Sequence, residues 1–200
     1  MTATALRLVG APRPIDVGVW LAVALLFGGS AAFARISQPE RRTIQGLDGA
    51  VQLTLPAGYG VQNEADELVV QRPALGSIAP RLSVRRVVRP TTVDPALFRD
   101  LELTRIEQER AHSGLGYRTL DAGDEPSFGA EHSSFSRYAV VQDPPLARAG
   151  DAVMPRVVTG LDALVVNGED AYHVSTSVDA SDSEGAAELD AILATLRVGS

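Results

Sequence analysis

Apolar and polar residues alternate with a period of two in several short stretches of this chain. From Val51 to Leu55 every second residue is apolar, which predicts a half-buried β-strand that ends at Pro56. Further strands are predicted at residues 67–72, 82–88, 117–120, 128–142, 157–166 and 171–178. We expect these stretches to form a mainly antiparallel sheet of about six or seven strands.

Two other stretches have the spacing of helices. Asp94 followed by Pro95 predicts a helix start, with Asp as the N-cap and Pro at the first helical position, and the helix is expected to end near His112. Ser181 and Glu184 are spaced as a capping box that begins a second helix. The apolar residues of this second helix recur on one face: Leu189, Ile192, Leu193 and Leu196.

The order of these elements is three strands, a helix, four strands and a helix, which predicts an α+β domain with two helices packed on the sheet. The last two strands are separated by Asn167 and Gly168. This dipeptide predicts a tight hairpin, because Asn and Gly adopt the positive φ angles that such turns require.

The longest apolar segment spans residues 15–34 and contains one charged residue, Asp16. A helix of about 20 apolar residues crosses the hydrocarbon core of a bilayer. The same segment fits a secretory signal, because the small residues Ala32 and Ala34 stand where a signal peptidase cleaves. Both interpretations stay open: a retained transmembrane anchor, or secretion after cleavage at Ala34.

This segment divides the chain into a short tail (1–14), the anchor or signal (15–34), a juxtamembrane linker (35–46) and the α+β domain (47–200). All 18 basic residues are Arg, which we interpret as the codon bias of a GC-rich bacterial genome. We therefore expect a single-pass protein of the bacterial cytoplasmic membrane, with its domain on the periplasmic or extracellular side.

The formal net charge of −7 argues against nucleic acid as a partner, since binding to phosphates needs a concentrated basic surface. The chain contains no Cys, which excludes disulfides, thiolate metal sites and cysteine nucleophiles.

No catalytic pattern is recognisable. His112, His132 and His173 do not have metal-ligand spacing, although the last two lie on predicted strands and could meet across the sheet. Ser127 is preceded two residues earlier by Glu125, where a nucleophile elbow requires Gly. The acidic residues between 179 and 190 do not match a calcium loop and are better explained by the dipole of the second helix. We expect no enzyme activity, no metal and no cofactor.

One feature of the first helix points to a partner. At 100° per residue, Leu97, Phe98 and Leu101 form one face, which we expect to pack inward. Leu103 and Ile106 project towards roughly the opposite side. They are either covered by a neighbouring loop or form a docking surface for a partner protein.

Three segments resemble the PsbP-like domains, including the DcrB-type bacterial envelope proteins. They are VQLTLPAGY at 51–59, AYHVSTS at 171–177 and the terminal DAILATLR at 190–197. In that family a strand ending in LP-x-G-aromatic opens the domain, and Tyr59 here stands where Trp is common. The resemblance covers about residues 47–198 and implies a sheet between helices, an extracytoplasmic location and an accessory or assembly role beside membrane complexes. It implies no catalytic residue.

The sequence thus predicts a non-enzymatic, membrane-tethered extracytoplasmic module that binds and stabilises a membrane protein complex. The alternative is a secreted protein that binds a small ligand in a cavity between sheet and helix.

Overall fold

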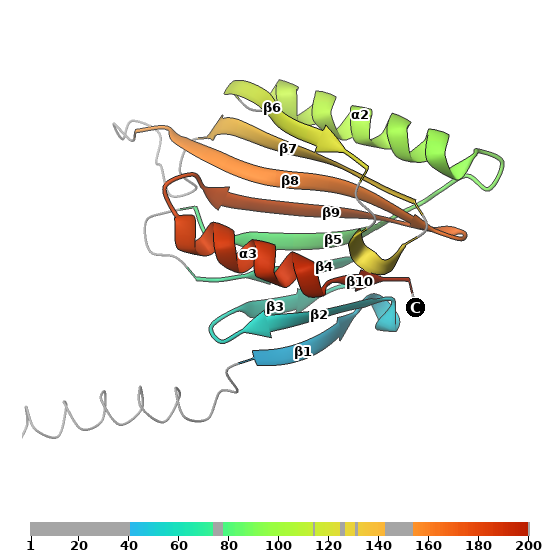
Figure 1. Ribbon diagram of the computed structural model, residues 1–200, viewed down its shortest axis with the longest axis horizontal. Helices are drawn as coiled ribbons and strands as arrows, with labels where there is room; N and C mark the ends of the chain where they lie inside the picture. The colour runs from blue at the N-terminus through green and yellow to red at the C-terminus, as the bar shows by residue number, and fades with distance from the viewer. Residues whose placement is uncertain are drawn as a thin grey trace, which may run out of the picture. The chain divides into compact units, whose positions relative to one another are not determined.

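The computed structural model describes residues 41–73, 78–113, 115–124, 127–130, 132–142 and 154–199 (Figure 1). The predicted tail, the anchor or signal segment 15–34 and residues 35–40 of the predicted linker lie outside this part of the chain. Among the described residues, no helix is both long and apolar enough to cross a membrane.

The described residues form an α+β domain with two α-helices, as the sequence predicts. The helices are α2 (Pro95–Ser113) and α3 (Ser183–Thr195), with short 3-10 turns η1 (Leu47–Gly49) and η2 (Ser127–Gly129). The strands are β1 (Arg41–Gly46), β2 (Val51–Pro56), β3 (Gly60–Asn63), β4 (Glu67–Gln71), β5 (Arg81–Val87), β6 (Leu115–Gly123), β7 (His132–Gln142), β8 (Arg156–Asn167), β9 (Asp170–Asp179) and β10 (Arg197–Val198).

The strands form two antiparallel sheets. The larger sheet has seven strands in the order β3-β4-β5-β9-β8-β7-β6, and the smaller has three in the order β1-β2-β10 (Figure 1). Strand β5 therefore pairs with β9 in the middle of the large sheet, with Ser83 opposite Ser175. This pairing joins segments about ninety residues apart and sets the position of the site described below.

The two faces of the large sheet differ in chemistry. On β9, Tyr172 and Val174 belong to the main hydrophobic core, together with Leu53 of the small sheet and Leu189 of α3. The residues between them on β9 point to the opposite face, because side chains alternate along a strand. Helix α2 contacts β6, β7 and β8 on that second face, and no other helix of the described residues covers the β9–β5–β4 part (Figure 1).

Residues 41–46, which the sequence predicts as the end of a linker, instead form strand β1. Ile44 pairs with Leu53 of β2, and a guanidinium nitrogen of Arg42 donates a hydrogen bond to the carbonyl of Tyr59 at 2.7 Å. The alternation of apolar and polar residues is weak in this segment because β1 is an edge strand whose side chains are largely exposed.

Strand β7 is shorter than its apolar pattern predicts. It begins at His132, not at Phe128, because Phe128 lies in η2 with a positive φ of 82°. Phe128 is nevertheless buried in the main core. The predicted alternation within β7 is confirmed: Phe135 packs on the main core, whereas Tyr138 belongs to a separate cluster.

The start of α2 is confirmed. The Asp94 carboxylate accepts hydrogen bonds from the backbone N–H groups of Ala96 and Leu97, at 3.0 and 3.1 Å. The start of α3 differs by one residue from the predicted capping box. Its N-cap is Asp182, which accepts from the N–H of Gly185 at 2.8 Å. Three residues of the predicted apolar stripe of α3 and the C-cap Leu196 are buried, as expected.

The hairpin between β8 and β9 is present, with Asn167 paired to Asp170 across a two-residue turn. Only Gly168 has the expected positive φ, at 58°. Asn167 instead closes the hairpin against the C-terminal end of the chain, because its side-chain amide donates to the carbonyl of Gly199 at 2.6 Å.

Candidate functional site

The faces of helix α2 differ from the predicted ones. Ile106 is only 3% exposed and Leu103 is half-buried, whereas Leu97 and Leu101 are 53% and 60% exposed. Ile106 therefore cannot serve as an exposed docking residue in this fold, and that part of the prediction is wrong.

The reason lies in the surface that α2 covers. The helix residues with well-covered side chains include Arg99, Glu102, Ile106 and Arg110, which follow one another at helical spacing along one face. We call these four residues the inward stripe. The stripe is mostly charged because the sheet beneath it carries buried polar groups, Ser134, Ser136 and Asp162, beside apolar ones such as Leu164. A search for an apolar face therefore selects the wrong side of this helix.

Arg110 anchors the C-terminal part of α2 to the sheet. Its guanidinium binds both carboxylate oxygens of Asp162 on β8, one of them at 2.7 Å, and donates to the hydroxyl of Ser175 at 2.7 Å. The same carboxylate accepts a hydrogen bond from Nε2 of His173 at 2.9 Å. The guanidinium also lies over the ring of Tyr138, 4.4 Å from its centroid, in a cation–π contact.

Tyr138 can lie across the sheet because residue 160 is a glycine. A Cβ at Gly160 would come within 2.6 Å of the Tyr138 hydroxyl and 2.1 Å of the Thr176 carbonyl. The Tyr138 hydroxyl donates to that carbonyl at 3.1 Å, and its ring stacks on Tyr117 with centroids 6.0 Å apart. These contacts give the Arg110 guanidinium a rigid support.

The charges in this network stabilise one another. Burial acts to raise the pKa of Asp162, but the hydrogen bonds from His173 and Arg110 outweigh it and hold that pKa below its ordinary value. Burial likewise acts to lower the pKa of Arg110, and the bond to Asp162 reverses the shift, so the pKa is raised. Asp162 and Arg110 are therefore a charged pair at neutral pH.

A polar groove of about 350 Å³ lies beside this network, between α2 and the open part of the sheet. We call it the α2 groove. Arg110 contributes from the helix, and the remaining lining side chains belong to the sheet. They are Glu67 of β4; Arg81, Ser83 and Arg85 of β5; Gln142 of β7; and His173, Ser175 and Ser177 of β9.

The strand register sets the spacing of these groups. The groove residues of β5 lie directly opposite those of β9 in the pairs Arg81–Ser177, Ser83–Ser175 and Arg85–His173. Each strand supplies every second residue, so one face presents arginine, serine and histidine side chains while the other holds the core. The arrangement offers many hydrogen-bond donors on a rigid floor.

Sequence reasoning missed this groove. The signal was present as polar residues at alternate positions of two apolar strands, Arg81, Ser83 and Arg85 in one and His173, Ser175 and Ser177 in the other. Their neighbourhood depends on the pairing of β5 with β9, which no local pattern specifies.

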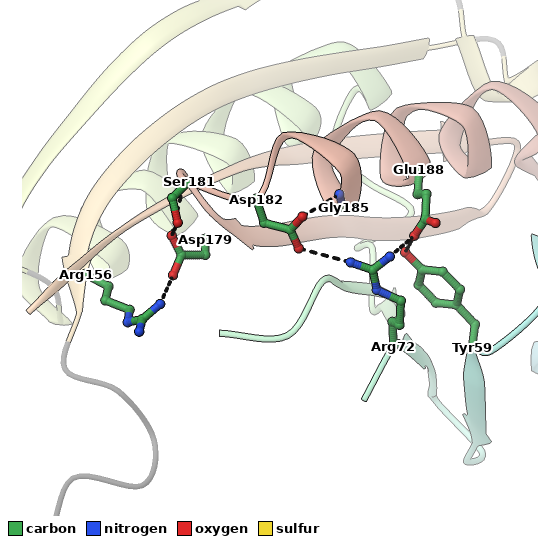
Figure 2. Close-up of polar contacts among 8 residues, drawn as sticks. All are labelled: Tyr59, Arg72, Arg156, Asp179, Ser181, Asp182, Gly185 and Glu188. Atoms are coloured by element: carbon green, nitrogen blue, oxygen red, sulfur yellow. Dashed lines mark hydrogen bonds and ion pairs between the residues drawn. The ribbon is translucent and has the colours of Figure 1, made fainter. Parts of the chain in front are cut away.

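The acidic residues near α3 have structural roles (Figure 2). The Asp182 carboxylate caps the helix through Gly185 and also accepts from Arg72 at 3.1 Å. Glu188 accepts from the other Arg72 nitrogen at 2.8 Å and from the Tyr59 hydroxyl at 3.0 Å. Burial, then the bond to Glu188, raises the pKa of Tyr59. This cluster fixes α3 to the segment after β4.

Asp179 is the last residue of β9, and its carboxylate also has hydrogen-bond partners within the protein (Figure 2). It accepts hydrogen bonds from Arg156 and from the Ser181 hydroxyl, both at 2.7 Å. The Arg156 guanidinium, with help from Ser181, lowers the pKa of Asp179 to about 2. Among the described residues, no group of three or more His, Asp and Glu side chains is placed to hold a metal.

The three histidines are not brought together. His112 bonds the carbonyl of Gln108 on its own helix, and His132 is exposed at the start of β7. His132 and His173 lie opposite different residues of β8, Val166 and Leu164. Residues 125 and 126 and the side chain of Ser127, considered as a possible nucleophile, lie outside the described part of the chain.

No protein-family model and no curated protein sequence matches this chain. Solved structures do match. The Ran-binding protein Mog1p of Saccharomyces cerevisiae has a TM-score of 0.50 and 10% identity, covering 80% of this chain and 96% of its own. Cyanobacterial PsbP (CyanoP) of Synechocystis has a TM-score of 0.51 and 10% identity, covering 82% and 95%.

A third structure, LpqN of Mycobacterium tuberculosis, is described as involved in cell envelope biogenesis. Its TM-score is 0.47 at 12% identity, covering 85% of this chain and 96% of its own. The likeness to CyanoP and Mog1p confirms the predicted resemblance at the level of the fold: the domain has the PsbP-like architecture.

Proposed function

We propose that this protein is a non-enzymatic, membrane-tethered accessory module that binds and stabilises a membrane protein complex on the outer side of the membrane. The α2 groove is the observation that carries the proposal. Part of its donor set is held in place, because Arg110 and His173 both bind the buried carboxylate of Asp162 and Arg110 also binds Ser175. Such preorganised donors are suited to recognising a partner, because little side-chain freedom is lost on binding.

The fold supports a binding role. Mog1p, which has the same architecture, is described as a Ran-binding protein, so at least one protein of this fold binds another protein. Since one fold can host many functions, the proposal for this chain rests on its own groove and uses the likeness only as support.

Tethering is proposed from the sequence. The apolar segment 15–34 is long enough for a membrane anchor, and Arg35, which directly follows it in the sequence, is suited to the interface with the headgroups. Carbonate extraction of the expressed protein, with N-terminal sequencing, tests this part. We expect the protein to stay in the membrane pellet with its N-terminus intact; a soluble product that begins at Arg35 would contradict the anchor.

Partner binding is tested by filling the groove. Ser83→Trp places a large side chain on the groove floor without a change of charge, and Gln62→Trp places the same side chain on β3, at a residue that does not line the groove. Each variant is affinity-purified from detergent-solubilised membranes and its co-purified proteins are quantified by mass spectrometry. We expect Ser83→Trp alone to lose stoichiometric membrane partners. Equal recovery with both variants would contradict binding through the groove.

The groove also favours a second candidate function, small-ligand binding by a secreted form. Its volume of about 350 Å³ is at the lower end of ligand pockets. A thermal-shift screen of polar metabolites separates the two functions, since a ligand that binds the folded state raises the melting temperature. Stabilisation by one metabolite, together with a lack of membrane partners, would favour this candidate.

A further inference from the structure

The arginines of the α2 groove are not equally matched by acidic groups. Arg110 is bound to Asp162 through two hydrogen bonds, and Arg81 forms a longer ion pair with Glu67, at 3.7 Å. Arg85 is exposed and, among the described residues, makes no hydrogen bond or ion pair within the usual distances. Of the described residues that line the groove, Arg85 is therefore the arginine available to a ligand.

The acidic residues near Arg85 are already engaged. Glu67 lies opposite Arg85 in the β4–β5 ladder, but its ion pair is with Arg81. Glu102 of α2 is close enough for Arg85 to help lower its pKa, although both Glu102 oxygens are bound by Arg105, which is the main cause of that shift. Each of these two carboxylates is therefore already paired with an arginine other than Arg85.

The groove thus carries a positive surplus in an acidic protein. Among the described residues, three arginines face Asp162 and Glu67, which leaves one positive charge, and the Glu102–Arg105 pair adds none. The chain as a whole has a formal net charge of −7. A ligand group with a single negative charge balances this surplus, whereas a doubly charged phosphate would exceed it.

The groups beside Arg85 suit a carboxylate. A guanidinium presents two parallel N–H donors that match the two carboxylate oxygens. Ser83, on the same strand and the same face, and Ser177 on β9 add hydroxyl donors on the groove floor. Together they supply a charged fork and neighbouring donors at fixed spacing.

We propose that the α2 groove binds a carboxylate side chain on an acidic segment of the partner protein, with Arg85 as the clamp and the serine hydroxyls as supporting donors. This inference rests on the proposed function, since it names the chemistry by which the accessory module recognises its partner. The groove lies along the strands at the surface of the sheet, so it can receive a side chain that projects from another protein.

The test uses the full chain in detergent and two fluorescent peptides with blocked ends, Ala-Ser-Glu-Ser-Ala and Ala-Ser-Gln-Ser-Ala, in a binding titration at low salt. We expect the Glu peptide to bind about tenfold more tightly than the Gln peptide, because charge-assisted hydrogen bonds are the stronger ones. Arg85→Gln should remove this preference. Arg118→Gln on β6, an exposed arginine outside the groove, makes the same change of charge and should retain it.

Three results would overturn the inference: equal binding of both peptides, equal losses in Arg85→Gln and Arg118→Gln, or binding of free acetate as tight as that of the Glu peptide. The last would indicate a small carboxylate as the ligand. Membrane purification of Arg85→Gln separates the two proposals. If the peptide preference is lost while the same membrane partners are recovered, the carboxylate inference fails and the proposed function stands. If wild-type protein binds the Glu peptide but recovers no partner, the proposed function fails.

Discussion

Helices α2 and α3 cover opposite faces of the seven-stranded sheet, but they are held there by different kinds of contact. Leu189, Ile192 and Leu193 of α3 are buried in the main core, as their spacing predicts. In α2, Ile106 is the one residue of the inward stripe that is apolar, and Arg110 binds the sheet through Asp162. An apolar stripe identifies the inward face of a helix only where the surface beneath it is also apolar.

The difference between the two helix-covered faces also determines where the candidate site lies. The apolar face under α3 is filled by the main core, with a groove of about 150 Å³ beside the helix, whereas the polar face under α2 continues beyond the helix as the α2 groove of about 350 Å³. The buried Asp162 connects the two parts, since it binds Arg110 of the helix and His173 of the groove floor. The same polar residues that hold α2 thus shape the candidate site.

The largest expected effect comes from charging the inward stripe of α2. Ile106→Asp places a carboxylate in a position that is 3% exposed, and we expect a loss of about 4 kcal/mol or failure to fold. Leu101→Asp on the opposite face, 60% exposed, should change stability by less than about 0.5 kcal/mol. Urea unfolding measures both. A similar loss of stability in the two variants would contradict the assignment of Ile106 to the buried face of α2 and Leu101 to its exposed face.

The next effect removes the polar anchor. Asp162→Asn keeps the shape of a side chain that is 2% exposed but leaves Arg110 without its counter-charge, and we expect a loss of about 3 kcal/mol. The control is Glu109→Gln, which breaks an ion pair between exposed side chains and should cost less than about 0.5 kcal/mol. If Asp162→Asn were as stable as wild type by urea unfolding, α2 would not depend on this pair.

Acid should lower the stability of the folded protein by protonating Asp179, which ends β9 shortly before α3. Its pKa is lowered from 3.8 to about 2 in the folded protein, so its contribution is complete above pH 3.8 and is lost as the pH falls towards 2. We expect stability to decrease by about 2 kcal/mol from this group over that range. Asp179→Asn should flatten this part of the pH profile, and an unchanged profile would contradict the role of the Arg156–Asp179 pair.

The smallest effect concerns the hairpin that places His173 on the groove floor. Gly168→Val should cost about 1–2 kcal/mol through backbone strain alone, because φ is 58° and a Cβ there would meet no atom within 4 Å. Gly168→Asn should cost less, since Asn tolerates positive φ. Equal melting temperatures for wild type, Gly168→Val and Gly168→Asn would contradict this reason for the glycine.

Local patterns were sufficient for most elements and insufficient for the site. The caps and periods around Asp94, Gly168 and Leu189 act over a few residues, and they predicted α2, the last hairpin and α3. Strands β1 and β3 were missed because exposed edge strands need little apolar alternation. The groove was missed because Ser83 and Ser175 become neighbours only through long-range pairing.

The central claim is that a membrane partner occupies the α2 groove, and site-specific photo-crosslinking tests it most directly. A photoreactive amino acid is placed at Ser83 on the groove floor, or at Gln62 on β3 as the control, and the full chain is irradiated in its native membrane. The account predicts a discrete crosslinked membrane protein from position 83, and loss of that product when Arg85→Gln is added. Equal products from positions 83 and 62, or no product at position 83, would contradict it.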